Sequence, residues 1–227
     1  AYLDVIVSFA TTAIENNYSR PEITEGFELE IVNGRHPVVE KLSGREEYVS
    51  NDVKFDDKER FMVLTGPNMA GKSTYMKQVA LITIMAQIGS YVPAEKAILP
   101  IIDKFLTRIG ASDDILTGQS TFMVEMSEVS NIINNATERS LIILDEVGRG
   151  TSTFDGISIA TAISEYIHDK IKAKTIFATH YHELTDLENK FDNMVNYRIE
   201  VEEKNNKVMF LRTILKGGAD KSYGLEV

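Results

Sequence analysis

The pattern of apolar and polar residues predicts strands and helices in alternation along most of the chain. Three short apolar runs predict buried strands: residues 61–65, 141–144 and 175–178. Three segments with apolar residues at helical spacing predict helices: residues 73–88, 121–137 and 158–171. Strands that alternate with helices form a mostly parallel sheet covered on both faces, so the expected fold class is α/β.

The first 18 residues place apolar side chains on one side of a predicted helix, which Pro21 ends. Because this helix begins at residue 1 without a capping residue, we expect the chain to be part of a longer one. We therefore assign residues 1–22 to the end of a connecting helix and residues 23–227 to one domain.

The remaining segments predict an antiparallel β subdomain beside the central sheet. Further strands are expected at residues 27–32, 104–109, 194–201 and 208–215, with a short strand around Tyr48 and Val49. The sequence KNN at residues 204–206 is typical of a hairpin turn between the last two strands. Residues 110–119 are expected to form a loop and residues 181–190 a helix.

Composition excludes several classes of protein. The 227 residues are 43% hydrophobic and 26% charged, which is typical of a soluble globular protein. The net charge of −10 argues against a chain that wraps nucleic acid by itself, because the phosphate backbone requires a basic face. There is no cysteine, which excludes a disulfide framework and a thiolate metal site. The longest helical apolar run, residues 79–88, is too short to span a bilayer, and no signal peptide is evident.

The stretch TGPNMAGKST at residues 65–74 fits the pattern G-x-x-x-x-G-K-[ST] of a phosphate-binding P-loop. It follows a predicted strand and opens a predicted helix, which is the context that the motif requires. This arrangement aims backbone N–H groups and the positive end of a helix dipole at one point. Gly66 and Gly71 allow a close backbone approach that a Cβ would block. The alternative is a chance glycine loop before a helix.

The P-loop predicts ATP or ADP with Mg²⁺ as the ligand. Lys72 is expected to reach the β- and γ-phosphates, and the Ser73 hydroxyl to bind Mg²⁺. The residues of the loop expected to contact the nucleotide are Gly66, Pro67, Asn68, Met69, Ala70, Gly71, Lys72, Ser73 and Thr74.

A second half of the site is expected where the apolar strand at residues 141–144 ends in Asp145 and Glu146. Strand carboxyl ends line the ligand crevice of a parallel sheet, so these carboxylates should face the P-loop. Asp145 is expected to hold Mg²⁺, and Glu146 to act as the general base toward water. A solvated acidic turn is the alternative.

His180 follows the next apolar strand, at residues 175–178. A histidine in that position would lie near the γ-phosphate and sense its presence. A capping histidine, or a metal pair formed by His180 and His182, are alternatives, although two histidines without a third ligand are a weak metal signal.

Two further stretches permit a structural and a functional interpretation. Ser120 opens a predicted helix and is suited to be its N-cap, or it supplies a second phosphate-binding helix end to the ATP of another subunit. Residues 148–156, GRGTSTFDG, form either a plain turn before a helix or a loop that contacts a partner protomer.

At these residues the chain resembles the ATPase domain of the MutS family of DNA mismatch-repair proteins, closer to the bacterial mismatch-recognition branch. The similar stretches are GPNMAGKSTYMKQ, IGSYVPA, STFMVEM, LDEVGRGTSTFDG, ATHYHEL and KSYGLEV, with RHPVVE and ENNYSRPEI before them. Together they cover nearly the whole chain. Ala70 departs from the glycine usual in the family, and we expect the loop geometry to survive if its φ is negative.

The resemblance implies a P-loop fold of the ABC-ATPase type, in which two domains pair head to tail and each ATP is closed over by the other protomer. Ser120 then contacts the partner's phosphates in trans, and residues 148–156 contact the partner. Asn68 hydrogen-bonds the phosphates, Tyr48 stacks on adenine, and Val49 lies beside it. Arg212 stands where many relatives carry a histidine, and its planar guanidinium could stack on the base. An exposed loop tyrosine is the alternative for Tyr48.

The resemblance further implies a homodimer in the intact protein, contact with mismatched duplex DNA through domains absent here, a MutL-type repair partner, and a cytoplasmic bacterial location without a membrane. The first helix resembles the end of the family's lever. We therefore expect an ATP hydrolase whose turnover converts mismatch recognition into a sliding clamp. The alternative is a nucleotide-gated dimerisation module with little turnover. A chromosome-condensing ABC protein is disfavoured, because no sustained heptads appear.

Overall fold

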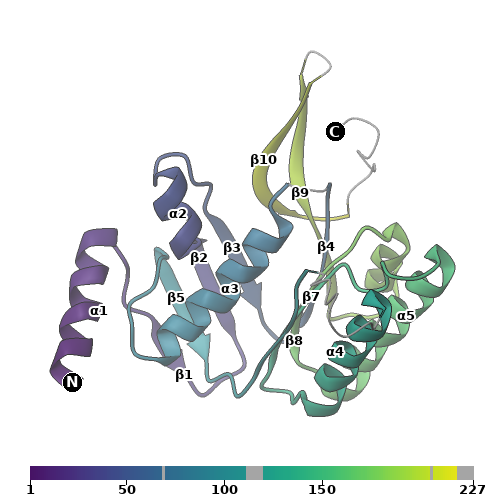
Figure 1. The fold of residues 1–227 in the computed structure, drawn as a ribbon, viewed down its shortest axis with the longest axis horizontal. Helices are drawn as coiled ribbons and strands as arrows, with labels where there is room; N and C mark the ends of the chain where they lie inside the picture. Colours follow the sequence, from purple (N-terminus) through teal and green to yellow (C-terminus); the bar gives the residue numbers. More distant parts are fainter. Residues whose placement is uncertain (68–69, 111–119, 205–206, 219–227) are drawn as a thin grey trace.

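The computed structural model describes residues 1–67, 70–110, 120–204 and 207–218. In these residues two β-sheets lie on either side of a long helix, α3, and further helices cover the far face of the larger sheet (Figure 1). The helices are α1 (Tyr2–Asn16), α2 (Pro37–Ser43), α3 (Lys72–Gln87), α4 (Thr121–Asn135), α5 (Thr153–Tyr166), a π-helical turn η1 (Ile167–Ile171) and a 3₁₀ helix η2 (His182–Asn189).

The larger sheet has six strands in the order β10-β9-β4-β8-β7-β6. Its strands are β4 (Phe61–Thr65), β6 (Phe105–Arg108), β7 (Leu141–Asp145), β8 (Lys174–Ala178), β9 (Met194–Lys204) and β10 (Lys207–Lys216). All neighbours pair in parallel except β9 and β10, which form an antiparallel hairpin. The carboxyl ends of β4, β8 and β7 therefore meet at one edge of the sheet.

The smaller sheet has four strands in the order β1-β5-β2-β3. Its strands are β1 (Glu22–Thr24), β2 (Leu29–Gly34), β3 (Asn51–Phe55) and β5 (Lys96–Pro100). The strands β2 and β3 and the strands β2 and β5 pair antiparallel, while β1 and β5 pair in parallel. This sheet places the segment before β3 beside the amino-terminal end of α3 (Figure 1).

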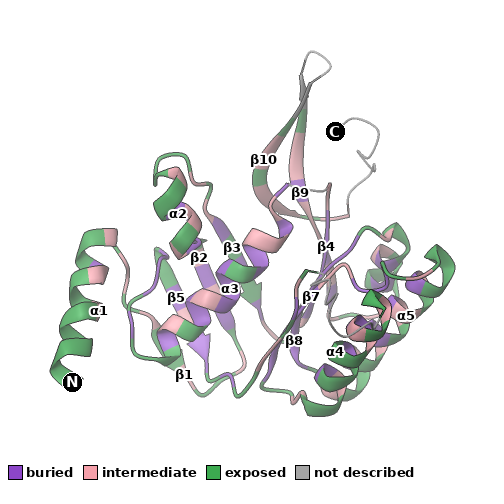
Figure 2. Cartoon of the chain, in the orientation of Figure 1, coloured by how far each residue is buried: buried purple, intermediate pink, exposed green. Residues whose placement is uncertain are grey.

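The helix α3 is buried along much of its length because it packs against both sheets (Figure 2). One apolar core joins its side chains to those of the strands around it, among them Leu29, Ile31, Val53, Leu64, Met76, Val79, Ile82, Leu99, Ile143 and Ile176. A second core fills the space between the larger sheet and the helices α4, α5 and η2. The two cores fix β4 and α3 from both sides.

The expected alternation of strands and helices, the mostly parallel sheet and the hairpin are confirmed, which establishes an α/β fold. The short strand expected at Tyr48 and Val49 is wrong: both residues precede β3, which begins at Asn51. The helix α2 and the strands β1 and β5 were not predicted. The helix α2 begins at Pro37, and the His36 ring accepts hydrogen bonds from the first turn, so the local cap decides its formation.

Helix boundaries also differ from the prediction. The helix α5 begins at Thr153, because the Ser152 hydroxyl caps it and the glycine inside its first turn hid the helical pattern. The helix α1 ends at Asn16, where Asn17 adopts a left-handed conformation with φ of 50°. In α1 only Ala13 is buried, and the other apolar side chains expected on its packed side are mostly exposed.

The loop expected at residues 110–119 falls almost wholly outside the described residues. Among the residues that the structure describes, no helix is long and apolar enough to cross a membrane.

The packing of α3 between the sheets predicts a large effect of Ile82→Ala. Ile82 is fully buried, and removing three methyl or methylene groups there should lower the free energy of unfolding by about 2–5 kcal/mol. Leu42→Ala is the matched control, because Leu42 is 83% exposed on α2 and its truncation should change stability by less than about 0.5 kcal/mol. Urea unfolding of both variants checks this, and equal losses would contradict it.

Candidate functional site

The loop between β4 and α3 turns the backbone toward the edge where the parallel strands end. Gly71 caps α3 with φ of 111°, a left-handed conformation that favours glycine. The buried Lys72 folds back over the loop, and its Nζ donates to the Gly66 carbonyl at 2.7 Å and to the Pro67 carbonyl at 3.1 Å. The N-terminus of a helix and a buried ammonium group thus meet at one point, which suits an anion.

Two other predictions for this loop have different outcomes. Asn68 and Met69 lie outside the described residues. Ala70 is buried, 1% exposed, in the core that α3 shares with both sheets. The loop therefore accepts alanine in a packed position, and the expectation of a negative φ at Ala70 stays a prediction.

Ser73 and Asp145 connect the P-loop helix to the end of β7. The Ser73 hydroxyl donates to Asp145 Oδ2 at 2.6 Å, although the two residues are 72 positions apart in the sequence. The second oxygen, Asp145 Oδ1, is buried and has no hydrogen-bond partner among the described residues. Buried polar atoms are normally paired, so this carboxylate oxygen is suited to bind a partner from outside the described residues.

Glu146 adopts a left-handed conformation with φ of 56°, which is uncommon for a side chain of this kind and clusters at functional sites. Its N–H donates to the Ala178 carbonyl of β8 at 2.9 Å. Its carboxylate oxygen Oε1 is hydrogen-bonded to His180 Nε2 at 2.5 Å. The other oxygen, Oε2, accepts a hydrogen bond from Arg149 Nη1 at 2.5 Å. Lys72 Nζ lies 3.9 Å from Oε1. One carboxylate thus collects three basic side chains from three different segments.

The two neighbouring carboxyl groups have pKa values displaced in opposite directions. The hydrogen bond from His180 is the largest cause that lowers the pKa of Glu146 to about 2, with Lys72 and Arg149 acting in the same direction against burial. Burial raises the pKa of Asp145, and the charge of Glu146 adds to this, against the hydrogen bond from Ser73. Burial lowers the pKa of Lys72. Such divergence between adjacent groups is typical of a functional site.

A cavity of about 280 Å³ opens beside these carboxylates. Its lining comes from the ends of β6 and β7, the start of α4 and the segment after β7: Arg108, Gly110, Thr121, Glu125, Asp145, Glu146, Arg149 and Gly150. Ser120 is exposed next to it as the N-cap of α4, with its hydroxyl accepting from the Met123 N–H at 3.2 Å. The structural interpretation of Ser120 as a cap is therefore observed.

The segment after Glu146 is held by two polar side chains at Gly148. The buried carboxylate of Glu125 accepts the Gly148 N–H, and the Tyr181 hydroxyl donates to the Gly148 carbonyl at 2.9 Å. Gly148 has φ of 94°, and a Cβ there would lie 2.7 Å from the Gly156 carbonyl oxygen. The start of the loop at residues 148–156 is thus rigidly placed beside the carboxylates.

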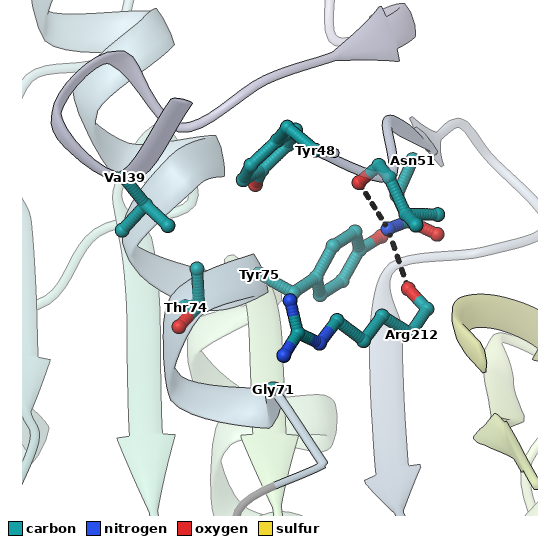
Figure 3. A pocket seen from close by; sticks show the side chains of 8 residues that line it. Val39, Tyr48, Asn51, Gly71, Thr74, Tyr75 and Arg212 are labelled. Atoms are coloured by element: carbon teal, nitrogen blue, oxygen red, sulfur yellow. Dashed lines mark hydrogen bonds between the residues drawn. The ribbon is translucent and has the colours of Figure 1, made fainter. Parts of the chain in front are cut away.

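A second cavity, of about 210 Å³, lies on the other side of the P-loop, between the two sheets (Figure 3). Its lining includes the three residues that the family resemblance assigned to the adenine base, together with parts of the P-loop helix: Val39, Tyr48, Val49, Asn51, Gly71, Thr74, Tyr75 and Arg212. Figure 3 shows Tyr48 and the Arg212 guanidinium on opposite sides of the cavity. The structure therefore brings Tyr48, Val49 and Arg212 together near the start of α3.

Sequence reasoning missed four side chains that organise these cavities. Asn51 and Gln78 hydrogen-bond to the walls of the cavity beside Tyr48 and Arg212, Glu125 holds Gly148, and Arg149 pairs with Glu146. Gln78 carried a usable signal, because a polar residue inside the apolar helix α3 requires buried partners. Asn51 and Arg149 occur in polar segments, where nothing in the local pattern distinguishes them, whereas Glu125 lies among apolar residues at the start of α4.

The donor set at Ser73 and Asp145 fits Mg²⁺. A hydroxyl and a carboxylate whose second, buried oxygen has no hydrogen-bond partner among the described residues are oxygen ligands, which Mg²⁺ prefers, so these two side chains would be suited to hold the ion. In the described part of the chain, no three histidine, aspartate or glutamate residues are grouped to hold a metal ion by themselves. His180 faces Glu146, so the weak alternative of a metal pair with His182 gains no support.

Comparisons with known proteins point to one family. A protein family model described as MutS domain V matches residues 62–227. The chain is 64% identical over 227 residues to the DNA mismatch repair protein MutS of Fusobacterium nucleatum, which covers 100% of this chain and 25% of the relative. It is 59% identical over 228 residues to the DNA mismatch repair protein MutS of Acetivibrio thermocellus and 61% identical over 230 residues to that of Clostridium tetani, covering 100% of this chain and 26% of each relative.

The chain thus spans about a quarter of the length of the relatives that it matches. The similarity includes every segment that forms the two cavities, and the family model covers most of the chain. The chain belongs to the MutS family, and its residues 62–227 match MutS domain V.

Proposed function

We propose that the chain is a Mg²⁺-dependent ATP hydrolase domain of the P-loop, ABC-ATPase type. The observation that carries this proposal is the hydrogen bond of 2.6 Å between Ser73 and Asp145, because it joins the phosphate-binding loop to the acidic strand end around one buried, unpaired oxygen. A hydroxyl and a carboxylate that meet at the N-terminus of a helix are suited to hold the metal of a nucleotide.

The residues around this bond have separate roles in the proposal. Lys72 exchanges the carbonyls of Gly66 and Pro67 for the β- and γ-phosphates, and the N–H groups at the start of α3 bind the phosphate oxygens. Bound Mg²⁺ supplies charge neutralisation at the phosphates. Glu146 orients water and accepts its proton, and His180 holds the Glu146 carboxylate and senses the γ-phosphate.

The base is assigned to the cavity that Tyr48, Val49 and Arg212 line. Its position beside Gly71 and Thr74 supports this assignment, because a base in the cavity would be within reach of phosphates bound at the P-loop. An aromatic ring on one side and a planar guanidinium on the other are suited to stack on the two faces of a purine.

The site is proposed to be completed by a second copy of the chain. Ser120 is exposed at the N-terminus of α4, and the exposed Phe154 lies in the nearby segment at residues 148–156. A helix N-terminus with an exposed hydroxyl is suited to bind the γ-phosphate of a partner's nucleotide. Head-to-tail pairing of two such chains gives two composite sites in one symmetric dimer.

In the intact protein, we propose that this activity serves DNA mismatch repair, as the names of the relatives indicate for them. Nucleotide turnover at the dimer would convert recognition of mismatched duplex DNA, bound by other parts of the protein, into a clamp that recruits a MutL-type repair factor. The net charge of −10 is consistent with DNA contact outside this chain.

A second candidate function is a nucleotide-gated dimerisation module with little turnover. The exposure of Ser120 favours it, because a lone chain whose γ-phosphate contact must come from a partner would bind nucleotide and hydrolyse it slowly. The two candidates differ in the turnover that the dimer reaches.

Substitutions at Glu146 and Lys72 separate hydrolysis from binding. Glu146→Gln should lower ATP turnover by about 10²–10⁴-fold and retain nucleotide binding, because only the general base is lost. Lys72→Ala should weaken binding of MgATP itself. The control is Asp57→Asn, which removes an exposed carboxylate at the far end of β4 and should leave turnover unchanged. Steady-state phosphate release with calorimetric binding checks this, and parental turnover by either site variant would contradict the proposal.

Mixing two inactive variants tests the composite site. Ser120→Asp keeps an N-cap residue but opposes a phosphate with a negative charge, so it should be inactive, as should Lys72→Ala. A mixed dimer contains one site with the intact Lys72 of one chain and the intact Ser120 of the other. Equal mixing should therefore restore about a quarter of the parent's turnover. If each site were contained within one chain, mixing the two variants would restore no turnover. In a separate measurement, parent turnover that stays low at every protein concentration would favour the binding module.

The pKa of Glu146 should depend on His180. In the parent the carboxyl has a pKa of about 2, below its ordinary 4.5, so its contribution to stability is complete above pH 4.5 and is lost as the pH falls toward 2. His180→Ala should raise the pKa of Glu146 and reduce this acid-dependent loss, whereas His180→Gln, which can still donate, should retain more of it. Carboxyl NMR titration checks the order, and identical titrations in all three proteins would contradict it.

A further inference from the structure

One side-chain amide connects both walls of the base cavity. Asn51 Nδ2 donates to the Arg212 carbonyl at 2.9 Å and to the Val49 carbonyl at 3.4 Å, as the two dashed lines in Figure 3 show. The first carbonyl belongs to the wall that β10 provides, and the second to the segment that carries Tyr48. Because one nitrogen bonds to both, the two walls are held at a separation that this amide sets.

The wall formed by β10 requires such a support. The strand pairs Phe210 with Val201 and Ile214 with Ile199, so four steps along β10 oppose two steps along β9, which is a β-bulge. Inside it Arg212 adopts a left-handed conformation with φ of 59°, which is costly for a residue with a Cβ. Asn51 bonds to both sides of the bulge, because its Oδ1 also accepts the Ile214 N–H at 2.8 Å.

A second amide supports the opposite wall. The fully buried Gln78 accepts the Tyr48 hydroxyl on Oε1 at 2.8 Å and donates from Nε2 to the Asn51 carbonyl at 3.3 Å. Gln78 extends from α3, the helix that begins at the P-loop. The aromatic ring, the amide pair and the bulge therefore form one hydrogen-bonded chain behind the cavity, Tyr48-Gln78-Asn51-Arg212.

We propose that Asn51, supported by Gln78, is the positioning residue that sets the separation of Tyr48 and Arg212 and thereby the affinity and selectivity for a purine base. This inference rests on the proposed function, because it assigns the cavity to the base of a nucleotide. Asn51 itself does not contact the base in this proposal and acts by holding Tyr48 and Arg212 in place. Its donor and acceptor groups are largely occupied by the protein backbone, so the contacts to the base are left to the ring, the guanidinium and the backbone near Val49.

The placement of Asn51 makes this role specific to the base and separate from the phosphates. Asn51 begins β3 in the smaller sheet, whereas Arg212 lies in β10 of the larger sheet, so the amide spans the boundary between the sheets. The phosphate-binding loop, by contrast, lies between β4 and α3 and has its own contacts at Lys72 and Ser73. Disturbing Asn51 should therefore open the base cavity without changing the P-loop.

The test compares ligands that carry a base with one that lacks it. Asn51→Asp replaces the donating nitrogen with an oxygen that faces two carbonyl oxygens and retains the acceptor for Ile214. Binding of MgADP, MgGDP and magnesium pyrophosphate is measured by calorimetry on the parent and the variant. We expect the affinity for MgADP to fall about tenfold in Asn51→Asp, and the preference of the protein for MgADP over MgGDP to fall with it. The affinity for magnesium pyrophosphate should stay within about twofold of the parent value. Asn189→Asp, an exposed change of the same kind, is the control and should alter none of these values.

A double-mutant cycle with Arg212→Gly tests whether Asn51 acts through the bulge. Glycine adopts the left-handed conformation without a penalty and removes the guanidinium, so in that background Asn51→Asp should lose less MgADP affinity than in the parent. Gln78→Glu, which retains the acceptor for Tyr48 and loses the donor to Asn51, repeats the comparison if Asn51→Asp unfolds, as thermal unfolding would show.

The outcomes separate this inference from the proposed function. Equal weakening of MgADP and pyrophosphate would mean a general structural role and would overturn the inference, as would unchanged MgADP affinity. An undiminished effect in the Arg212→Gly background would also overturn it. In each of these cases the proposed function still stands, provided that the parent binds MgADP. A parent that binds neither MgADP nor MgATP overturns the proposed function and this inference together.

Discussion

The parallel register of β4, β8 and β7 is the constraint on which the candidate site depends. Ala178 of β8 pairs with Leu64 of β4 on one side and with Asp145 of β7 on the other. This register brings the end of the P-loop strand level with the acidic strand end, although two strand spacings, about 10 Å, separate them. The helix α3 crosses that distance and places Ser73 on Asp145. A slip of one residue in β7 would turn Asp145 to the other face of the sheet and remove the contact.

Much of this central architecture could be predicted from the sequence, because buried parallel strands and their helices have strong local signals. The runs at residues 61–65, 141–144 and 175–178 are apolar on both faces, as strands covered on two sides must be. The P-loop pattern fixed the strand before it and the helix after it. The convergence of Lys72, Asp145 and Glu146 then followed from a general property of parallel sheets, that ligands bind at the carboxyl ends of strands.

The smaller sheet and the cavity beside Tyr48 and Arg212 were less predictable, because their formation depends on distant partners. The strand β5 contains Pro100 and pairs with β1 and β2, which lie 60 to 80 residues earlier, so nothing near it indicates a strand. Tyr48 and Val49 look like strand residues, yet they face a cavity whose other wall is more than 160 residues away. Asn51 sits at the first position of a strand, and its contacts with Val49 and the bulge become visible only in the folded chain.

Glu146 and Arg212 both have a left-handed backbone conformation, and both line a cavity. Each occurs where a strand must redirect a charged side chain toward a cavity, and neither is the glycine or asparagine that favours such a conformation. In both cases polar partners stabilise the arrangement. The Glu146 backbone bonds to Ala178 and its carboxylate to His180, while the Arg212 backbone bonds to Asn51. Both of these strained residues line a cavity, Glu146 the one beside Asp145 and Arg212 the one beside Tyr48.

The two cavities differ in what a ligand that filled both would do to the fold. The cavity beside Asp145 and Glu146 lies at the edge of the larger sheet, whereas the cavity beside Tyr48 and Arg212 lies between the sheets, so one ligand in both would join the two sheets through α3. The smaller sheet is in turn connected to α1, because the Arg35 side chain at the end of β2 donates to the Asn17 carbonyl at 3.3 Å and to the buried Glu40 at 2.7 Å. A ligand stabilises whichever arrangement of the sheets it binds better. A ligand in the cavity beside Tyr48 and Arg212 would therefore contact the part of the fold that connects to α1, whereas a ligand confined to the cavity beside Asp145 and Glu146 would not.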